Sequence, residues 1–217
     1  AHRYRKKVLI ASTSEIYGKA RHIPFREDDD RVLGTTGVGR WSYSMSKAID
    51  EHFAFAYAAK GLPVAIVRYF NSYGPRLDER GYGSVVANFI RQALRDEPIT
   101  VHGDGKQTRC FTYIDDTVAG TLLAAEAPRA VGEAFNIGST RETSIQDVAK
   151  TIQRRARSNS PIKVVPYASN YGEGFEDTRR RVPAVDKAKR LLGFVPKVDL
   201  ETGLKKTIAW CRTHFTH

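Results

Sequence analysis

The 217-residue sequence is long enough for one large domain or a domain with a small lobe, and its 41% hydrophobic and 27% charged content is ordinary for a soluble globular protein. A membrane protein is excluded, because the longest apolar run, residues 53–59, is too short to cross a bilayer and residues 8–11 are too short for a signal-peptide core. Cys110 and Cys211 are isolated and the six histidines are scattered, which predicts no metal site and a reduced, cytoplasmic setting.

The net charge of +11 raises the question of a nucleic-acid partner. The basic residues are divided among clusters at residues 3–7, 154–157, 179–181 and 187–190. Most of these clusters fall on expected helix faces or helix ends, where solvated charge is the simpler interpretation, and no nucleic-acid-binding motif accompanies them. A phosphate-bearing small molecule is therefore the preferred partner, and nucleic acid is not expected.

The first 83 residues have the pattern of a buried parallel sheet. Residues 8–11 are a continuous apolar run, typical of a strand covered on both faces. After a polar loop, a helix is expected from Ser42 to Lys60, and residues 64–67 form the next buried strand. Strand, long helix and strand in succession predict a βαβ unit of an α/β sheet. Residues 53–59 are apolar all round this helix, which predicts a second subunit covering it.

Beyond residue 83 the expected elements are shorter and mixed. Helices are predicted at residues 84–97, 115–126, 144–157, 186–192 and 200–215, and strands at residues 99–102, 109–113, 134–137 and 163–167. The strands at 99–102 and 109–113 flank a Gly-Asp-Gly turn. We therefore place a domain boundary near residue 83.

Two groups of polar residues suggest chemistry at the ends of these elements. Tyr43 and Lys47 share one face of the expected helix, so the ammonium can favour the deprotonated phenol and make it a proton acceptor. Thr13 and Glu15 follow the first strand, where open α/β sheets bind their ligands. A simpler interpretation of that second group is a capping box opening a short helical turn at Ser12.

Five motifs occur in order along the chain. They are Ala-Ser-Thr-Ser-Glu-Ile-Tyr-Gly at 11–18, Tyr-Ser-Met-Ser-Lys at 43–47, Arg-Tyr-Phe-Asn-Ser-Tyr-Gly-Pro-Arg at 68–76, Gly-Asp-Gly-Lys-Gln-Thr-Arg at 103–109 with its continuation to 116, and Phe-Asn-Ile-Gly at 135–138. Together they resemble the extended short-chain dehydrogenase/reductase family of NAD-dependent nucleotide-sugar enzymes, over nearly the whole chain. The resemblance implies an α/β fold: residues 1–83 are the second half of a Rossmann-type doubly wound parallel sheet. Residues 84–217 are then mainly a smaller α/β nucleotide-sugar-binding lobe, with some segments returning to the sheet.

Within this family the chain is most similar to UDP-glucuronate decarboxylases, such as the decarboxylase domain of the bifunctional polymyxin-resistance protein. The distinctive stretches are residues 40–47, 70–78 and 171–177, the last leading into Arg181-Val-Pro. Sugar 4,6-dehydratases mostly carry an acid where this chain has Ser14, and C4 epimerases generally lack the following glutamate. GDP-mannose dehydratases carry the same Thr-Ser-Glu, but residues 70–75 do not resemble their corresponding loop. The resemblance therefore favours oxidative decarboxylation of UDP-glucuronate through a 4-keto intermediate. A 4-epimerase or 4,6-dehydratase of the same family is the alternative.

The resemblance also assigns site residues by position. The catalytic set is Thr13, Glu15, Tyr43, Lys47 and Arg181; the residues at the NAD cofactor are Ser12, Tyr43, Lys47 and Tyr69; and those at the substrate are Asn71, Arg109 and Arg181. Two of these assignments keep an alternative. Arg109 alone reads as a solvated charge at a strand edge, and Arg181 is one of three consecutive arginines.

The family's glycine-rich phosphate-binding loop is expected before residue 8 and is not found there. Gly34, Gly37 and Gly39 follow an acidic loop instead of a strand, so they are not that fingerprint. We expect these 217 residues alone to bind NAD weakly, to show no turnover and to associate, with homodimerisation through the helix from Ser42 to Lys60. The alternative of another class is a non-enzymatic nucleotide-sugar-binding or dimerising fragment without cofactor.

Overall fold

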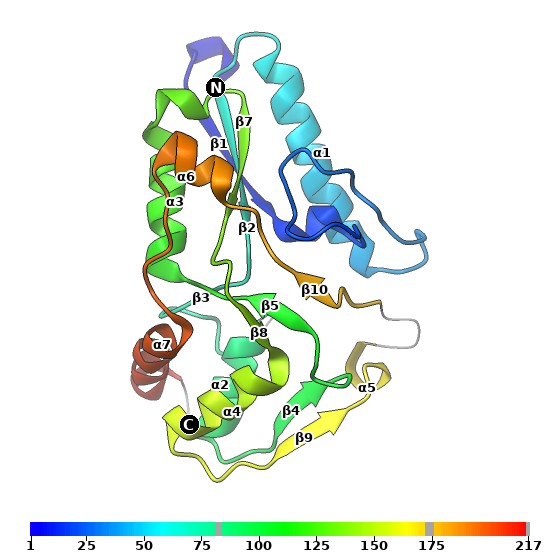
Figure 1. Cartoon of the computed structure of the whole chain (residues 1–217), viewed down its shortest axis with the longest axis vertical. Helices are drawn as coiled ribbons and strands as arrows, with labels where there is room; N and C mark the ends of the chain where they lie inside the picture. The colour runs from blue at the N-terminus through cyan, green and yellow to red at the C-terminus, as the bar shows by residue number, and fades with distance from the viewer. Residues whose placement is uncertain (81–83, 172–175, 216–217) are drawn as a thin grey trace.

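A three-stranded parallel sheet forms the upper half of the molecule in Figure 1. The computed structural model describes residues 1–80, 84–171 and 176–215. The sheet has the order β1-β2-β7, from β1 (Val8–Thr13), β2 (Val64–Tyr69) and β7 (Glu133–Ile137). Among the described residues, β1 and β7 are its two edges. The expected parallel α/β architecture is confirmed, and the three strands end side by side.

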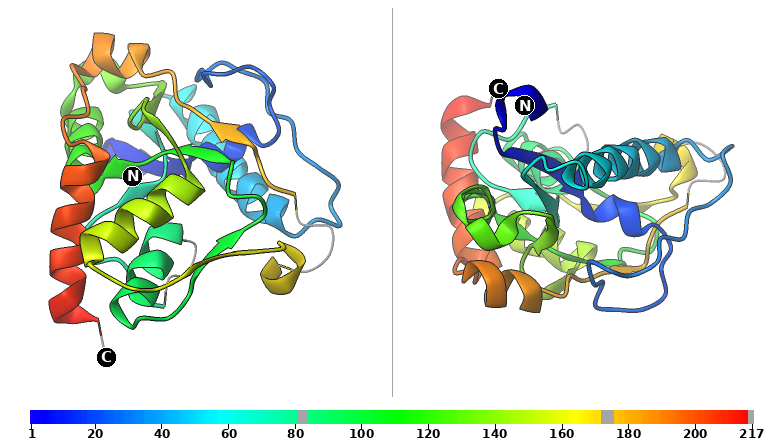
Figure 2. Two further views of the ribbon diagram at one scale, coloured as in Figure 1. Left: turned by 60° about the horizontal axis from the view of Figure 1, so that its bottom comes forward. Right: turned by 90° about the horizontal axis from the view of Figure 1, so that it is seen from above.

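Helices cover both faces of this sheet. The long α1 (Arg40–Ala58) lies against one face, and α3 (Ile114–Glu126) and α6 (Asp186–Leu192) lie on the other, as the view from above in Figure 2 shows. β2 is buried at nearly every position, since it is both the central strand and covered on its two faces. This is the continuous apolar pattern that residues 64–67 predicted.

The lower half is a smaller α/β lobe. Its helices α2 (Val85–Leu94), α4 (Ile145–Ala156) and α7 (Leu200–His214) pack together around an apolar core. Side-chain oxygens cap all three helices at their N-termini: Ser84 accepts from Ala87 N, Ser144 from Asp147 N and Asp199 from Thr202 N. β4 (Ile99–His102) and β9 (Ile162–Val165) pair in parallel at the far edge of the lobe.

Short strands join the two halves. They are β3 (Ser72–Tyr73), β5 (Thr108–Cys110), β6 (Thr112–Tyr113), β8 (Glu142–Ser144) and β10 (Arg180–Arg181). The remaining elements are the 3-10 turns η1 (His2–Tyr4), η2 (Ser14–Tyr17) and η3 (Pro128–Ala130), and the short α5 (Ala168–Tyr171). β5 lies between β10 and β8, and β3 pairs with β6.

The structure corrects one expected strand. Residues 109–113 form two strands, because β5 pairs with β8 and β10, while β6 pairs with β3 in a different sheet. The strand β4 pairs with β9, so the Gly-Asp-Gly turn does not connect two paired strands. Helix and strand ends elsewhere differ from expectation by a few residues. The expected boundary at residue 83, and residues 172–175 of the distinctive stretch 171–177, lie outside the described residues.

Candidate active site

The first site residues lie where β1 ends. Thr13 is the last residue of the strand, and its Oγ1 accepts a hydrogen bond from Glu15 N at 3.2 Å, which caps the turn η2. Ser44 of α1 donates to the carbonyl oxygen of Glu15 at 2.8 Å and fixes this turn to the helix. The short helical turn offered by the sequence is therefore present, with Thr13 as its capping residue.

Two guanidinium groups hold the carboxylate of Glu15. Arg181 Nη1 donates to Oε1 at 2.5 Å, and Arg40 Nη2 donates to Oε2 at 3.1 Å and to Oε1 at 3.3 Å. Burial by itself would raise the pKa of Glu15, but the charges and hydrogen bonds of Arg181 and Arg40 outweigh it, and the pKa lies below its ordinary value. Glu15 is therefore ionised at neutral pH in this arrangement.

A second carboxylate, that of Asp177, extends this cluster. Its Oδ1 accepts from Arg40 Nη1 at 2.9 Å and from Arg109 Nη2 at 2.8 Å, and its Oδ2 accepts from the Tyr167 hydroxyl at 2.7 Å. Burial opposes the charge on Asp177, yet Arg109, the Tyr167 hydroxyl and Arg40 lower its pKa below the ordinary value. Arg40 thus connects the two carboxylates.

Arg109 is buried and firmly held. Its Nη1 donates to the carbonyl oxygens of Thr108 and Thr178, both at 2.8 Å, while Nη2 contacts Asp177. Burial and the neighbouring charge of Arg181 lower the pKa of Arg109 to about 10, which still leaves it cationic at neutral pH. With a side chain only 8% exposed, Arg109 is not a solvated strand-edge charge.

Asn71 lies just beyond the end of β2 in a left-handed backbone conformation, with φ of 41°. Its Oδ1 is buried and, among the described residues, has no hydrogen-bond partner. A left-handed non-glycine residue with an unsatisfied buried oxygen is a marker of a functional position.

A cleft of about 990 Å³ brings these groups together between the two halves of the molecule. Its volume is at the upper end of the range for small-molecule sites. The polar groups on its wall include Glu15, Arg40, Asn71, Arg109, Asp177 and Arg181. Four of the residues assigned by resemblance are therefore neighbours in one cleft, although their positions span the chain from 15 to 181.

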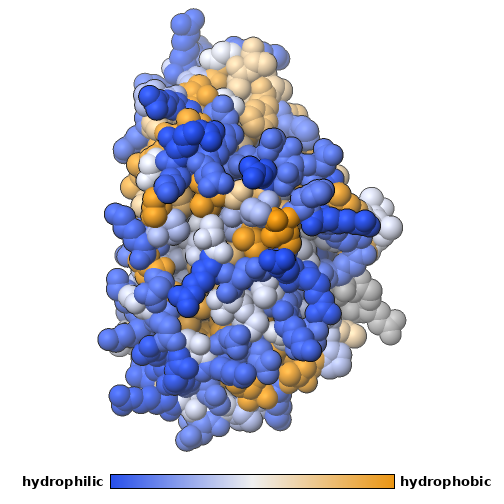
Figure 3. All heavy atoms as spheres, viewed as in Figure 1, coloured by the Kyte–Doolittle hydropathy of each residue, from blue (hydrophilic) through white to orange (hydrophobic). Residues whose placement is uncertain are grey.

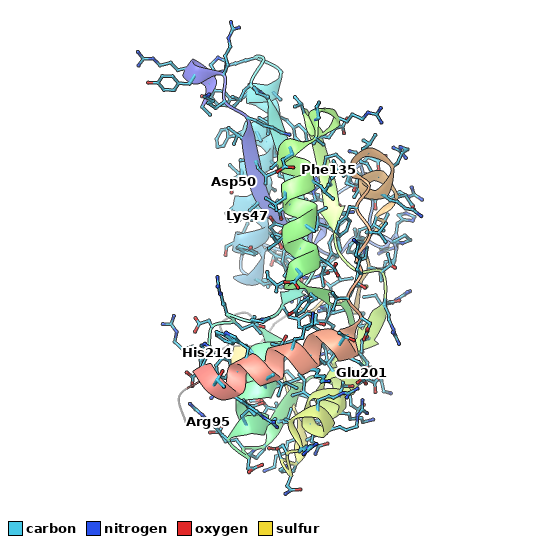
Figure 4. All side chains as sticks on the ribbon, turned by 90° about the vertical axis from the view of Figure 1, so that its left-hand side faces the viewer. Lys47, Asp50, Arg95, Phe135, Glu201 and His214 are labelled. Carbon is cyan, nitrogen blue, oxygen red and sulfur yellow. The ribbon has the colours of Figure 1, made fainter. Side chains whose placement is uncertain are left out.

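Tyr43 and Lys47 lie on α1, outside the lining of this cleft. The Tyr43 side chain is 52% exposed, and Lys47 Nζ pairs with Asp50 at 3.3 Å; Figure 4 shows Lys47 and Asp50 together beside the sheet. Ser44, the residue after Tyr43, bonds to the turn η2 that follows β1, and α1 contacts both η2 and β1. Their assignment as the proton-accepting pair stays a prediction.

Ser12 belongs to a buried polar network next to the site. Its hydroxyl donates to Glu51 Oε1 at 2.5 Å, and Glu51 also receives Arg68 Nε at 3.0 Å and Nη2 at 2.6 Å. Arg68 Nη1 in turn donates to the Tyr17 hydroxyl at 2.8 Å. The network joins β1, β2 and α1 beneath Thr13. Tyr69, the other residue assigned to the cofactor, shares a hydrogen bond with Thr121 at 2.9 Å.

Three residues of the cluster were not anticipated from the sequence. They are Arg40, Tyr167 and Asp177. Arg40 stands three residues before Tyr43, and that spacing places the two on neighbouring positions of the helix surface. Arg40 also begins the distinctive stretch 40–47 and Asp177 ends the stretch 171–177, but neither residue was given a role. Tyr167 was expected at the end of a strand from 163 to 167, whereas β9 ends at Val165 and Tyr167 lies in the turn that follows.

Residues of the basic clusters at 154–157 and 179–181 form surface ion pairs. Arg154 and Arg155 pair with Glu201, Arg179 with Asp104, and Arg180 with Glu142. The face drawn in Figure 3 is largely hydrophilic, with hydrophobic residues in separate patches. Within the described residues, no helix is both long and apolar enough to cross a membrane, and no three His, Cys, Asp or Glu side chains gather as a metal site would require.

The doubly wound sheet and the arginine-lined cleft at its carboxyl edge define a Rossmann-type protein of the extended short-chain dehydrogenase/reductase class. Comparison with known families agrees. The chain belongs to the GDP-mannose 4,6-dehydratase family, whose model matches residues 1–207. The family expected from the five motifs is thereby confirmed.

The individual relatives that match the chain include enzymes that act on nucleotide-linked uronic acids. The chain is 50% identical, over 96% of its length, to UDP-N-acetyl-alpha-D-glucosaminuronate decarboxylase of Bacillus cytotoxicus, and 38% identical, over its full length, to UDP-glucuronic acid decarboxylase 1 of Xenopus tropicalis. It covers 64% of the first relative and 49% of the second. The crystal structure of UDP-glucuronic acid 4-epimerase from Bacillus cereus with UDP-glucuronic acid and NAD superimposes with a TM-score of 0.84 at 29% identity, over 96% of this chain and 62% of that one.

Proposed function

We propose that this chain carries the substrate cleft and the acid–base residues of an NAD-dependent decarboxylase acting on a UDP-linked uronic acid. The supporting observation is the cluster in which Arg40 and Arg181 hold Glu15 while Arg109 lies in the same cleft. A nucleotide-linked uronate carries a diphosphate and a sugar carboxylate, and arginine forks bind both kinds of anion. The similarity to two uronate decarboxylases supports decarboxylation as the reaction.

The substrate is oriented by its two anionic groups. The diphosphate lies against Arg109 and the side-chain amide N–H of Asn71, while the buried Oδ1 of Asn71 can accept a hydrogen bond from a hydroxyl of the ligand. The sugar carboxylate faces Arg181, which Glu15 holds in position. Burial of these groups strengthens their interaction with charge, since little water competes with them.

The residues that we propose for contact with NAD are those at its nicotinamide end. Tyr43 is half-exposed on α1, and Lys47 lies one helical turn further along the same helix. A phenol and an ammonium placed in this way can donate hydrogen bonds to the ribose that carries the nicotinamide, so the two residues fit that end of NAD. Ser12 and Tyr69 are the other proposed contacts at this end. The glycine-rich loop that binds the NAD phosphates is not found in this sequence.

The proposed chemistry removes carbon dioxide from an oxidised sugar. Bound NAD would supply the hydride acceptor for C4. Tyr43 takes the proton of the C4 hydroxyl, favoured by Lys47, and Thr13 hydrogen-bonds that hydroxyl. With C4 a ketone, the bond from C5 to the carboxylate breaks and its electron pair enters an enolate, whose charge Arg181 stabilises. A proton returned to C5 completes the 4-keto-pentose.

The test is to identify the products formed by the natural protein that contains this sequence. NMR should show loss of the carboxyl carbon from UDP-glucuronate or UDP-N-acetylglucosaminuronate in the presence of NAD, and no reaction of UDP-glucose. Interconversion of C4 epimers with the carboxylate retained would replace this proposal by an epimerase. Ser14 offers a hydroxyl where most sugar 4,6-dehydratases carry a carboxylic acid, which favours a decarboxylase over those enzymes.

We also propose a homodimer through the face of α1 that points to solvent. Met45, Ile49, Phe53 and Tyr57 recur every four residues along this helix and are 45%, 44%, 64% and 46% exposed. An apolar stripe of this length is unusual on the surface of a monomer. A second copy of the helix would bury it.

A further inference from the structure

Among the described residues, three buried arginines and two acids form the polar cluster of the cleft. Arg40, Arg109 and Arg181 have side chains that are 13%, 8% and 5% exposed, and the two acids that they contact, Glu15 and Asp177, are 22% and 16% exposed. Guanidinium groups bind phosphate oxygens as readily as carboxylates, so an anionic ligand in this cleft would meet donors that the two acids already use.

Asp177 occupies the position from which such an anion would be bound. One oxygen, Oδ1, accepts from both Arg40 and Arg109, and the other accepts from Tyr167. Arg109 Nη1 donates to two backbone carbonyl oxygens, which hold the guanidinium in place and leave Nη2 as the atom directed at Asp177. Asp177 and both arginines line the cleft. A ligand phosphate approaching Arg109 Nη2 must therefore share that donor with Asp177 or replace it.

We propose that Asp177 is an internal counter-ion that competes with the ligand's diphosphate for Arg109 and thereby sets the affinity of the site. In the ligand-free protein it compensates the charge of the arginines and keeps them in place. When a diphosphate binds, Asp177 gives up Arg109 and keeps Arg40, which lies between the two acids. The inference rests on the proposed function in taking the ligand to be a nucleoside diphosphate sugar.

The test measures binding of two probes, UDP and inorganic pyrophosphate, by calorimetry. Asp177→Asn preserves the size of the side chain and removes its charge, so both probes should bind about tenfold more tightly, the scale of one charged hydrogen bond that the ligand no longer has to displace. Glu176→Gln is the matched control: the same charge is removed one residue away, from a carboxylate that pairs with Lys19 and Trp41 instead of the arginines. It should leave both dissociation constants unchanged, and Arg109→Ala should raise them.

The outcomes separate this inference from the proposed function. Equal or weaker binding of both probes to Asp177→Asn would show that Asp177 only supports the arginines, and would overturn the inference. Should that variant be poorly folded, Asp177→Ala tests the same expectation with the carboxylate removed altogether. If Asp177→Asn binds pyrophosphate tenfold more tightly but UDP does not bind at all, the role of Asp177 as a counter-ion is supported and the proposed nucleotide-sugar function is refuted. Wild-type protein that binds neither probe contradicts both.

Discussion

The buried pair of Glu51 and Arg68 offers a prediction about stability whose size follows from the structure. Glu51 is 5% and Arg68 6% exposed, and the Glu51 carboxylate accepts three hydrogen bonds, one from Ser12 and two from Arg68. Glu51→Gln keeps the shape but turns an amide NH₂ toward the guanidinium and leaves Arg68 as an uncompensated buried charge. The expected loss is about 3 to 5 kcal/mol of unfolding free energy. That is a large part of the total of about 5 to 15 kcal/mol for a typical protein.

Urea unfolding of the purified protein measures this loss as a shift in midpoint at constant m value. The matched control is Glu201→Gln, the same substitution at an acid that pairs with Arg154 and Arg155 on the surface and is 43% exposed. Its cost should stay below about 1 kcal/mol. Replacing both Glu51 and Arg68 by Met should destabilise less than the two single changes added together. Equal costs for Glu51→Gln and Glu201→Gln would refute the reasoning.

Three further predictions concern charge, thiols and association. The pKa of Glu15 is depressed in the folded protein, so its contribution to stability is complete above its ordinary pKa of 4.5 and is lost as the pH falls through the folded value. The difference in unfolding free energy between wild type and Glu15→Gln should therefore shrink over that acid range. A difference that does not depend on pH would contradict the ion pairs of Glu15 with the two arginines. Burial raises the pKa of Cys110 and of Cys211 to about 12, so neither thiol should react with a thiol reagent at pH 8 until the protein unfolds, and rapid labelling of native protein would show the burial to be wrong. Phe53→Lys should convert an associated species into monomer in light scattering, whereas Val164→Lys, at an exposed valine of the other lobe, should not. An unchanged mass for Phe53→Lys would exclude α1 as the interface.

Secondary structure was predictable where apolar residues repeat over many positions. The strand at 64–67 and the helix at 144–157 were recognised because each buries a continuous surface against a large core. The strands β3, β8 and β10 were missed, since two or three residues are too few to show alternation. Residues 109–113 looked like one strand because the change of partner sheet at Phe111 leaves no mark in the sequence pattern.

The candidate site was likewise predictable only in part. Glu15, Asn71, Arg109 and Arg181 were assigned from the motifs, and the structure places all four in the lining of one cleft. Asp177 ends one of the distinctive stretches but could not be given a role, because its importance comes from contacts with Arg109 and Arg40, far away in sequence. A closer reading could have found Arg68, because it is the one charged residue in an otherwise apolar, buried strand, which indicates a buried partner. Its partner Glu51 could not be singled out, since Lys47 and Asp50 are charged residues of the same helix.

The release of carbon dioxide tests the central claim most directly. The natural protein containing this sequence, given NAD and UDP-glucuronate labelled at the carboxyl carbon, should release labelled carbon dioxide; the N-acetylated uronate is assayed in parallel. Tyr43→Phe, which removes the proton-accepting phenol while leaving a ring of the same shape, should lower that rate at least about a hundredfold. UDP affinity should change little, since Tyr43 lies outside the cleft. Retention of the label in a C4 epimer, or near wild-type release by Tyr43→Phe, would contradict the account.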